Sequence, residues 1–188
     1  FIPYIQNDTL ILEVIVEKAK VIIIMGSDSD LGQMKAAADI LDEFRIPYDI
    51  HVSSAHRTPA RTHEIVEKGE AEGAEVFIAA AGGAAHLAGV VASHTALPVI
   101  GVPISTNMMG GMDALLATVQ MPPGIPVATV AIGGAKKAGI LAAQILSVKD
   151  LSLRKVLKDY RQKMAEGVCA KDEKLSSMTV AEYLEQKK

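Results

Sequence analysis

Short apolar runs recur along the chain, separated by loops and amphipathic stretches. The run KVIIIM at 20–25 is rich in β-branched residues, which is typical of a strand covered on both faces. Similar runs occur at 76–81 (VFIAAA), 98–102 (PVIGV) and 126–132 (PVATVAI). The segment YDIHV at 48–52 instead alternates apolar and polar side chains, which indicates a half-buried strand. The pattern therefore predicts five strands.

Each predicted strand is followed by a segment with helical periodicity. The second helix opens with Thr58 and Pro59, a good cap and first-turn pair, and later helices are expected at 82–95, 112–120 and 136–146. The apolar face of the first helix is formed by Leu31, Met34, Ala38 and Leu41. Five strand–loop–helix units predict a three-layer, doubly wound α/β fold, with a parallel sheet and helices on both faces. Five strands favour the flavodoxin-like order 2-1-3-4-5 over the six-stranded dinucleotide-binding type.

Two segments lie outside this repeat and divide the chain. Residues 1–18 are expected to be an N-terminal extension with an apolar stripe, followed by the α/β domain at 19–166. Residues 167–188 are expected to be a C-terminal helical tail, in which Thr179 and Glu182 match a capping box. An amphipathic terminal helix of this kind more often docks on a neighbouring chain or on its own domain than carries chemistry.

Composition narrows the class of protein. With 49% hydrophobic residues among 188, the chain can form one domain with a sizeable core. A net charge of −3 and the lack of a basic stripe argue against a nucleic-acid or anionic-membrane partner, and no apolar run is long enough to span a membrane. The single cysteine, Cys169, is interpreted as an incidental thiol. A single cysteine cannot form an internal disulfide, and no secretory signal is evident. Both observations suit a reducing cytoplasm, so a cytoplasmic protein is expected.

Polar and glycine-rich loops follow the carboxyl end of every predicted strand. In open parallel sheets, ligands bind beyond the carboxyl ends of the strands. A functional site is therefore expected to be built from the loops at 26–30, 53–57, 82–86, 103–111 and 133–136.

The first of these loops, GSDSD at 26–30, has the place of a phosphate-binding loop. Ser27 and the free amides of the next helix can hold an anion, whereas Asp28 and Asp30 are better suited to sugar hydroxyls. The loop matches neither the Walker pattern nor the dinucleotide fingerprint. An equally compatible alternative is that Ser29 or Asp30 only caps the helix.

The second loop places a histidine beside an arginine, in the sequence SAHRTP. Arg57 can grip a phosphate in bidentate fashion, and His56 can exchange a proton near neutral pH. A lone histidine often only hydrogen-bonds a turn. Its position beside Arg57, at the end of a strand and opposite the first loop, favours a chemical role for His56.

The third loop, AGGAAHL at 81–87, consists of small residues. Ligand atoms can lie against such a backbone, and the amides that start the next helix can donate to an oxyanion. His86 either lines the site or is a buried structural support, with support slightly favoured. The remaining histidines, His51, His63 and His94, have no companion ligands at metal-binding spacing, so no metal is expected.

Six motifs occur in an order and at intervals that resemble a known family. They are MGSDSD, SAHRTP, AGGAAHL, LPVIGVP, VQMPPGIPVATVAI and GILAAQIL. Together they are similar to the PurE family, the N5-carboxyaminoimidazole ribonucleotide mutases of purine biosynthesis, from about Lys20 to about Glu166. The resemblance implies that His56 is the proton carrier. It implies that the ribonucleotide is bound at Ser27, Asp30 and Arg57, and we expect further substrate contacts from Asp28, Ser54, Ala55, Gly83, Ala84 and His86.

The resemblance also carries expectations about cofactors, assembly and the reaction. It implies a homo-octamer that acts on a small ribonucleotide without any metal or nucleotide cofactor. A related branch, the aminoimidazole ribonucleotide carboxylases, takes free CO2 and commonly has lysine after the histidine. Arg57 and the complete AGGAAHL loop favour the mutase branch. Ala80, Ala88 and Lys137 depart from the glycine, proline and asparagine that are common in the family, and they affect the expected shape of the pocket.

Two alternatives of a different kind remain open on the sequence. One is a non-catalytic flavodoxin-like module that binds FMN, which is disfavoured because no site loop contains an aromatic residue to stack on a flavin. The other is an assembly scaffold with an altered terminus.

Overall fold

The structure is a computed structural model that describes residues 18–107 and 109–187. Its five strands form one parallel sheet of order β2-β1-β3-β4-β5, which confirms the flavodoxin-like topology. The N-terminal extension expected at 1–18 lies outside the described residues except for Lys18. The strands are β1 (Val21–Met25), β2 (Tyr48–Val52), β3 (Val76–Ala81), β4 (Val99–Pro103) and β5 (Ala128–Thr129).

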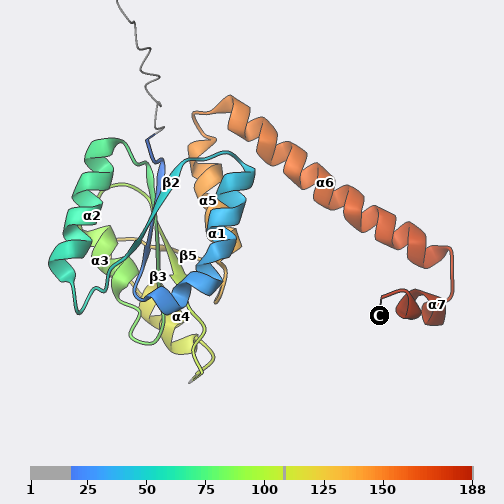
Figure 1. Cartoon of the computed structure of the whole chain (residues 1–188), viewed down its shortest axis with the longest axis horizontal. Coiled ribbons are helices and arrows are strands. Elements are labelled where there is room, and N and C mark those ends of the chain that lie inside the picture. The colour runs from blue at the N-terminus through green and yellow to red at the C-terminus, as the bar shows by residue number, and fades with distance from the viewer. Residues whose placement is uncertain (1–17, 108, 188) are drawn as a thin grey trace, which may run out of the picture.

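Helices cover both faces of the sheet and complete the three layers (Figure 1). One face carries α1 (Leu31–Glu43) and α5 (Ala135–Leu146), and the other carries α2 (Pro59–Glu72) and α3 (Leu87–Ser93). The helix α4 (Met112–Val119) packs against β4 and β5.

Alternating side chains of the central strand separate the core into two clusters. Val21, Ile23 and Met25 of β1 pack with α1 and α5, whereas Ile22 and Ile24 pack with α2 and α3. Successive strand residues point to opposite faces of a sheet, so a continuous apolar run is what a doubly covered strand requires. The sequence interpretation of β1 is therefore confirmed.

The two edge strands differ from their predicted forms. In β2, Ile50 and Val52 are 38% and 52% exposed, so the strand is less buried than its alternating pattern predicts. The physical reason is its edge position, together with the packing of α1 chiefly against α5. The strand predicted at 126–132 is reduced to β5. Pro126 has no N–H for the ladder, and beyond Val130 the bond to β4 comes from Gly133, whose N–H donates to the carbonyl of Pro103 at 2.9 Å.

The C-terminal region consists of a long helix, α6 (Leu151–Ser176), and a short one, α7 (Val180–Glu185). Leu153 and Leu157 anchor α6 in the core. Beyond residue 160 the helix is exposed and leaves the domain, and it passes residue 166 without a break (Figure 1). The predicted capping box of Thr179 and Glu182 is confirmed at the start of α7.

Within residues 18–107 and 109–187, no helix combines the length and the apolar character needed to cross a membrane.

Candidate active site

The loops after β1, β2 and β3 surround a pocket of about 430 Å³ at the carboxyl ends of these strands. The connections from β1 and β3 diverge here, with α1 on one face and α3 on the other, which is where doubly wound folds bind ligands. The pocket brings together seven residues predicted from the sequence, namely Ser27, Asp30, Ser54, Ala55, His56, Arg57 and Ala84.

His56 contacts a second histidine from the other side of the pocket. Its Nε2 lies 2.9 Å from Nδ1 of His86, and the two rings are nearly perpendicular at 82°. One nitrogen of this pair donates and the other accepts, so the protonation of the two rings is coupled and the orientation of the His56 ring is held by the contact. His86 itself is not part of the pocket lining. His86 is also exposed, so the buried support that the sequence slightly favoured is not what the structure shows; its ring instead orients His56 from outside the pocket lining.

Arg57 links the first two loops. Its Nη2 donates to the carbonyl oxygen of Gly26 at 3.3 Å, and its backbone N–H donates to Oγ of Ser54 at 3.3 Å. A guanidinium has five N–H donors in a fixed fork, so this single side-chain bond orients the group and leaves donors for an anion.

The loop at 26–30 forms a short 3-10 turn, η1 (Asp28–Asp30). Ser27 caps this turn, because its Oγ accepts from the N–H of Ser29 at 3.3 Å. Asp30 stands at the cap position of α1 without a side-chain capping bond. The alternative in which Ser29 or Asp30 serves only as a helix cap is therefore not what the structure shows.

The carboxyl group of Asp30 is buried in the wall of the pocket. Desolvation raises its pKa above the ordinary value, and the nearby charge of Asp28 acts in the same direction, while hydrogen bonds from Ser27 and Ser29 act against them. A buried carboxylate of this kind is stabilised when a ligand donates hydrogen bonds to it. It suits the hydroxyl groups of a sugar.

Two other predicted residues lie outside the pocket lining. Asp28 is exposed and faces a separate groove that it forms with Leu31 and Ile50, while it accepts a hydrogen bond from Oγ of Ser27 at 3.3 Å. Gly83 has a φ of +61° and turns the third loop toward α3, so its contribution is to the backbone path.

The loop after β4 contributes a residue that the sequence did not single out. Thr106 lines the pocket, and a Cβ at Gly82 would lie 2.8 Å from its methyl carbon, so the glycine permits the two loops to touch. Gln33 of α1 holds the same loop by two bonds: its Nε2 donates to the carbonyl of Ser105 at 3.3 Å, and the N–H of Ser105 donates to Oε1 at 3.4 Å. The position of 103–111 at a strand end was the available signal. The hydrogen bond between Gln33 and Ser105 joins residues 72 positions apart, and no local sequence pattern predicts it.

Two histidines outside the pocket form a close pair. His63 and His94 lie close together, with ring centroids 4.5 Å apart, and His63 pairs with Glu67. Within residues 18–107 and 109–187, however, no three histidine, cysteine, aspartate or glutamate side chains gather as a metal site. Cys169 is exposed on α6.

Comparison with known proteins connects this geometry to a family. The family described as AIR carboxylase matches residues 20–167. An N5-carboxyaminoimidazole ribonucleotide mutase of Thermotoga maritima is 55% identical over 165 residues, covering 88% of this chain and 96% of that protein. One of Pyrococcus horikoshii is 54% identical, covering 89% and 95%.

Relatives with another name and solved structures complete the comparison. A phosphoribosylaminoimidazole carboxylase of Schizosaccharomyces pombe is 49% identical, covering 89% of this chain but 30% of that protein. The crystal structure of Treponema denticola PurE superposes with a TM-score of 0.77 at 33% identity, covering 82% of this chain and 97% of that one. Both the sequence motifs and the fold thus lead to the same conclusion: the chain belongs to the AIR carboxylase, or PurE, family.

Proposed function

We propose that the protein is an N5-carboxyaminoimidazole ribonucleotide mutase. It converts N5-carboxyaminoimidazole ribonucleotide (N5-CAIR) into 4-carboxy-5-aminoimidazole ribonucleotide (CAIR) in de novo purine (IMP) biosynthesis, and it is therefore an isomerase. The observation that carries the proposal is the position of His56 in a pocket with Arg57 and Asp30, in a chain 54–55% identical to two proteins named as this mutase.

The pocket offers a matching group for each part of such a ribonucleotide. Arg57, Ser27 and the amides of the first loop suit the 5′-phosphate, and Asp30 suits a ribose hydroxyl. The small residues Gly82 and Ala84 leave space for the flat heterocycle and its carboxylate near His56. Binding requires no metal and no nucleotide cofactor in this proposal.

The reaction moves one carboxylate and one proton. First the bond between the exocyclic nitrogen and the carboxylate carbon breaks, its electron pair returns to nitrogen, and the imidazolium of His56 supplies a proton there. The products are CO2 and an enamine-like aminoimidazole ribonucleotide. C4 then attacks CO2 to form the new carbon–carbon bond, and the neutral His56 removes the C4 proton. The proton returns to the residue that gave it, so the cycle is balanced.

The contact between His56 and His86 supports this double role. A single group that acts first as acid and then as base must present the same nitrogen to both substrate atoms, and the 2.9 Å contact orients the ring for that purpose. The small residues around the pocket would also leave room for CO2 beside the heterocycle between the two steps.

The alternative function is direct carboxylation of aminoimidazole ribonucleotide with free CO2. It has the support of relatives named phosphoribosylaminoimidazole carboxylase. Arg57 directly after His56 and the AGGAAHL loop favour the mutase.

Ultraviolet monitoring of the purified protein distinguishes the two functions. We expect N5-CAIR to be converted to CAIR in buffer free of bicarbonate. His56→Asn is expected to retain the oligomeric mass of the wild type and to lose turnover by at least about 10²-fold, the contribution typical of a general acid–base. His63→Asn on α2 is the matched control and retains activity. Conversion of aminoimidazole ribonucleotide only with added bicarbonate would establish the carboxylase instead, and an active His56→Asn enzyme would refute the mechanism.

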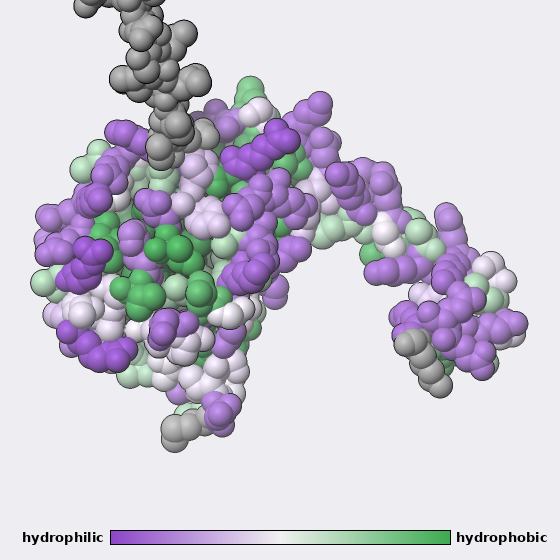
Figure 2. All heavy atoms as spheres, in the orientation of Figure 1, coloured by the Kyte–Doolittle hydropathy of each residue, from purple (hydrophilic) through white to green (hydrophobic). Residues whose placement is uncertain are grey.

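We propose in addition that the protein is a cytoplasmic homo-octamer. The family resemblance supports the number eight, and uncovered apolar side chains support assembly. Figure 2 shows hydrophobic side chains gathered over the β2 edge of the sheet, between α1 and α2. Exposed apolar residues of this kind occur at Leu31, Ile50 and Val52, and on α4 at Met112, Leu116 and Val119. Residues 19–166 would then be the catalytic domain, and residues 167–188 a tail that serves assembly.

A further inference from the structure

The corner between β2 and α2 is unusual because it contains no glycine. Residues 53–58 read SSAHRT, and the chain turns from a strand into a helix within them. His56 and Arg57 both lie on this corner. No residue of the corner has a positive φ, so none needs to be glycine; the N–H of Thr58 donates to the carbonyl of Ser54 at 2.9 Å, and side-chain bonds add to this backbone bond.

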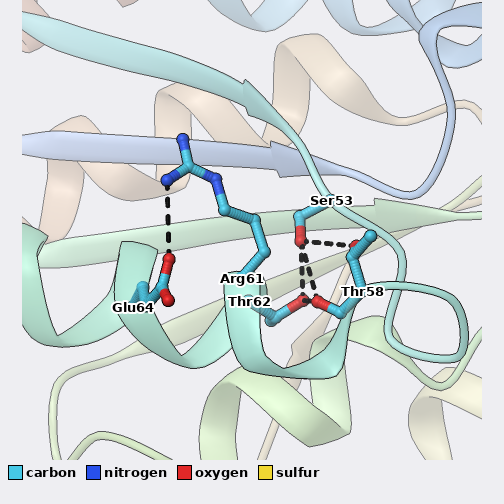
Figure 3. A network of polar contacts seen from close by, with 5 residues as sticks. All are labelled: Ser53, Thr58, Arg61, Thr62 and Glu64. Carbon is cyan, nitrogen blue, oxygen red and sulfur yellow. Dashed lines mark hydrogen bonds and ion pairs between the residues drawn. The ribbon is translucent and has the colours of Figure 1, made fainter.

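Three hydroxyl groups meet beneath the corner, as Figure 3 shows. Oγ of Ser53 lies 2.8 Å from Oγ1 of Thr62 and 3.2 Å from Oγ1 of Thr58. Ser53 and Thr62 are fully buried, at 2% and 0% exposure. Burying two hydroxyl groups is costly unless they are hydrogen-bonded to each other or to the backbone.

The hydrogen bonds form a consistent set in which each hydroxyl donates once. Either hydroxyl of the Ser53–Thr62 contact can donate; in the arrangement where each donates once, Ser53 donates to Thr62, Thr62 to the carbonyl of Thr58 at 3.4 Å, and Thr58 to the carbonyl of Ser54 at 3.1 Å. Oγ1 of Thr58 also accepts from the N–H of Ser54 at 2.9 Å. The three hydroxyls thereby join the end of β2, both ends of the corner and the first turn of α2.

Thr58 is the cap residue of α2, yet its side chain makes no capping bond to the helix. A threonine at this position ordinarily accepts a hydrogen bond from an amide of the first helical turn. Here the hydroxyl is turned back and bonds to Ser54 twice. The side chain therefore holds the corner that carries His56 and Arg57.

We propose that Ser53, Thr58 and Thr62 are positioning residues, a buried hydroxyl brace that sets where His56 and Arg57 stand. None of the three lines the pocket. The brace fixes Ser54 and Thr58 at the two ends of the corner, and the residues between them are held at their contacts with His86 and Gly26. This inference rests on the proposed mutase function. It explains how the corner keeps the proton carrier, His56, in a fixed position.

The test removes one hydroxyl without changing the shape of the side chain. Thr62→Val is expected to lower kcat/KM for N5-CAIR about tenfold to hundredfold, because a small misplacement of a catalytic group has an effect of that size. Thr62→Ser retains the hydroxyl and is expected to keep activity within a few-fold of the wild type. Ser53→Ala provides the same comparison with a smaller change if Thr62→Val does not fold.

The matched control is Ser147→Ala. Ser147 is also buried, and its Oγ donates to the carbonyl of Gln144 at 2.8 Å, but it ends α5 at the far side of the sheet. This variant is expected to lose comparable stability and to keep wild-type kcat/KM. The brace is overturned if Thr62→Val or Ser53→Ala retains wild-type kcat/KM, if Thr62→Ser is as impaired as Thr62→Val, or if the control loses equal activity.

A second readout separates this inference from the proposed function. In a crystal structure of Thr62→Val compared with wild type in the same crystal form, we expect the corner to shift and the contact between His56 and His86 to lengthen beyond 3.5 Å. An unchanged contact would overturn the brace. If the wild type shows no turnover, the proposed function fails, and the crystal comparison still decides the inference.

Discussion

Asp30 shows how a single carboxyl group can serve binding at a cost to stability. It is buried in the pocket wall, and its pKa is raised because burial disfavours the charged form. For a group with a raised folded-state pKa, the favourable contribution to folding is present below the unfolded-state value and is lost as the pH rises through the folded-state value. Above that window the ionised carboxylate therefore lowers the stability of the fold, and a hydrogen bond from a sugar hydroxyl would offset that cost.

Asp30→Asn is expected to separate these two effects. The variant should be more stable than the wild type at pH 7, with the difference shrinking as the pH falls toward the ordinary aspartate value of 3.8. Its kcat/KM should fall about tenfold to hundredfold, because a hydrogen bond to a charged group is lost. Urea unfolding across pH and steady-state kinetics measure both. If Asp30→Asn were less stable than the wild type at pH 7, burial of the charged carboxylate would not be destabilising, and the account would be wrong.

At this scale the sequence predicted residue types better than contacts. Glycine-rich and polar loops after apolar runs were sufficient to place His56, Arg57 and Asp30 at one edge of the sheet, and the structure brings them to one pocket. The contact from His56 to His86 joins two loops 30 residues apart and depends on ring orientation, which no local pattern encodes. Thr106 was missed for the same reason.

Among the elements, α1 and α5 make the closest helix contact in the core. A Cβ placed on Gly139 of α5 would lie 2.3 Å from Cγ2 of Ile40 and 3.0 Å from the carbonyl oxygen of Ala37. Both contacts are well inside normal packing distance, and the second involves rigid backbone. Gly139 therefore determines how closely the two helices approach.

Gly139→Ala is expected to destabilise the protein by about 1–3 kcal/mol, because overpacking outweighs the better helix propensity of alanine. The control is Gly167→Ala in α6, where a Cβ would meet nothing within 4 Å. That change should be neutral or stabilising by up to about 1 kcal/mol. Denaturant midpoints of the two variants provide the comparison. Equal midpoints would contradict the close approach.

The elements that the sequence predicted well are those with strong periodicity and double coverage. The bounds of β1, β3 and α5 agree with the predicted segments to within one residue, and α2 begins at Pro59 as predicted. β5 and the burial of β2 were less predictable, because an edge strand depends on one neighbour and on what happens to cover it. The length of β5 and the burial of β2 both depend on tertiary packing, which the periodicity of the sequence does not encode.

Several large apolar side chains are exposed on the described part of the molecule. Leu31 and Ile50 flank a groove on the β2 side, and Leu116 is one of several outward apolar residues of α4. The part of α6 beyond residue 160 is exposed and belongs to neither core cluster of the described residues, although α7 contacts it. These features are typical of surfaces that are covered in an assembly.

Ile50→Asp is expected to weaken that assembly. A charge in the apolar groove would have to be desolvated when a second chain covers it. Light scattering after size exclusion should give the mass of eight chains for the wild type and a lower mass for Ile50→Asp. Val148→Asp alters a residue that is 75% exposed outside the groove and should leave the mass unchanged. A monomeric wild type, or an unaffected Ile50→Asp, would contradict assembly through this face.

The most direct measurement is a crystal structure of the wild-type protein with CAIR bound. We expect a ring nitrogen of His56 within about 3.5 Å of the heterocycle at C4, where a proton can be transferred. The phosphate should contact Arg57 and Ser27, and a ribose hydroxyl should donate to Asp30. A heterocycle bound well out of reach of His56, with the phosphate away from Arg57, would contradict the assignment of His56 as the proton carrier.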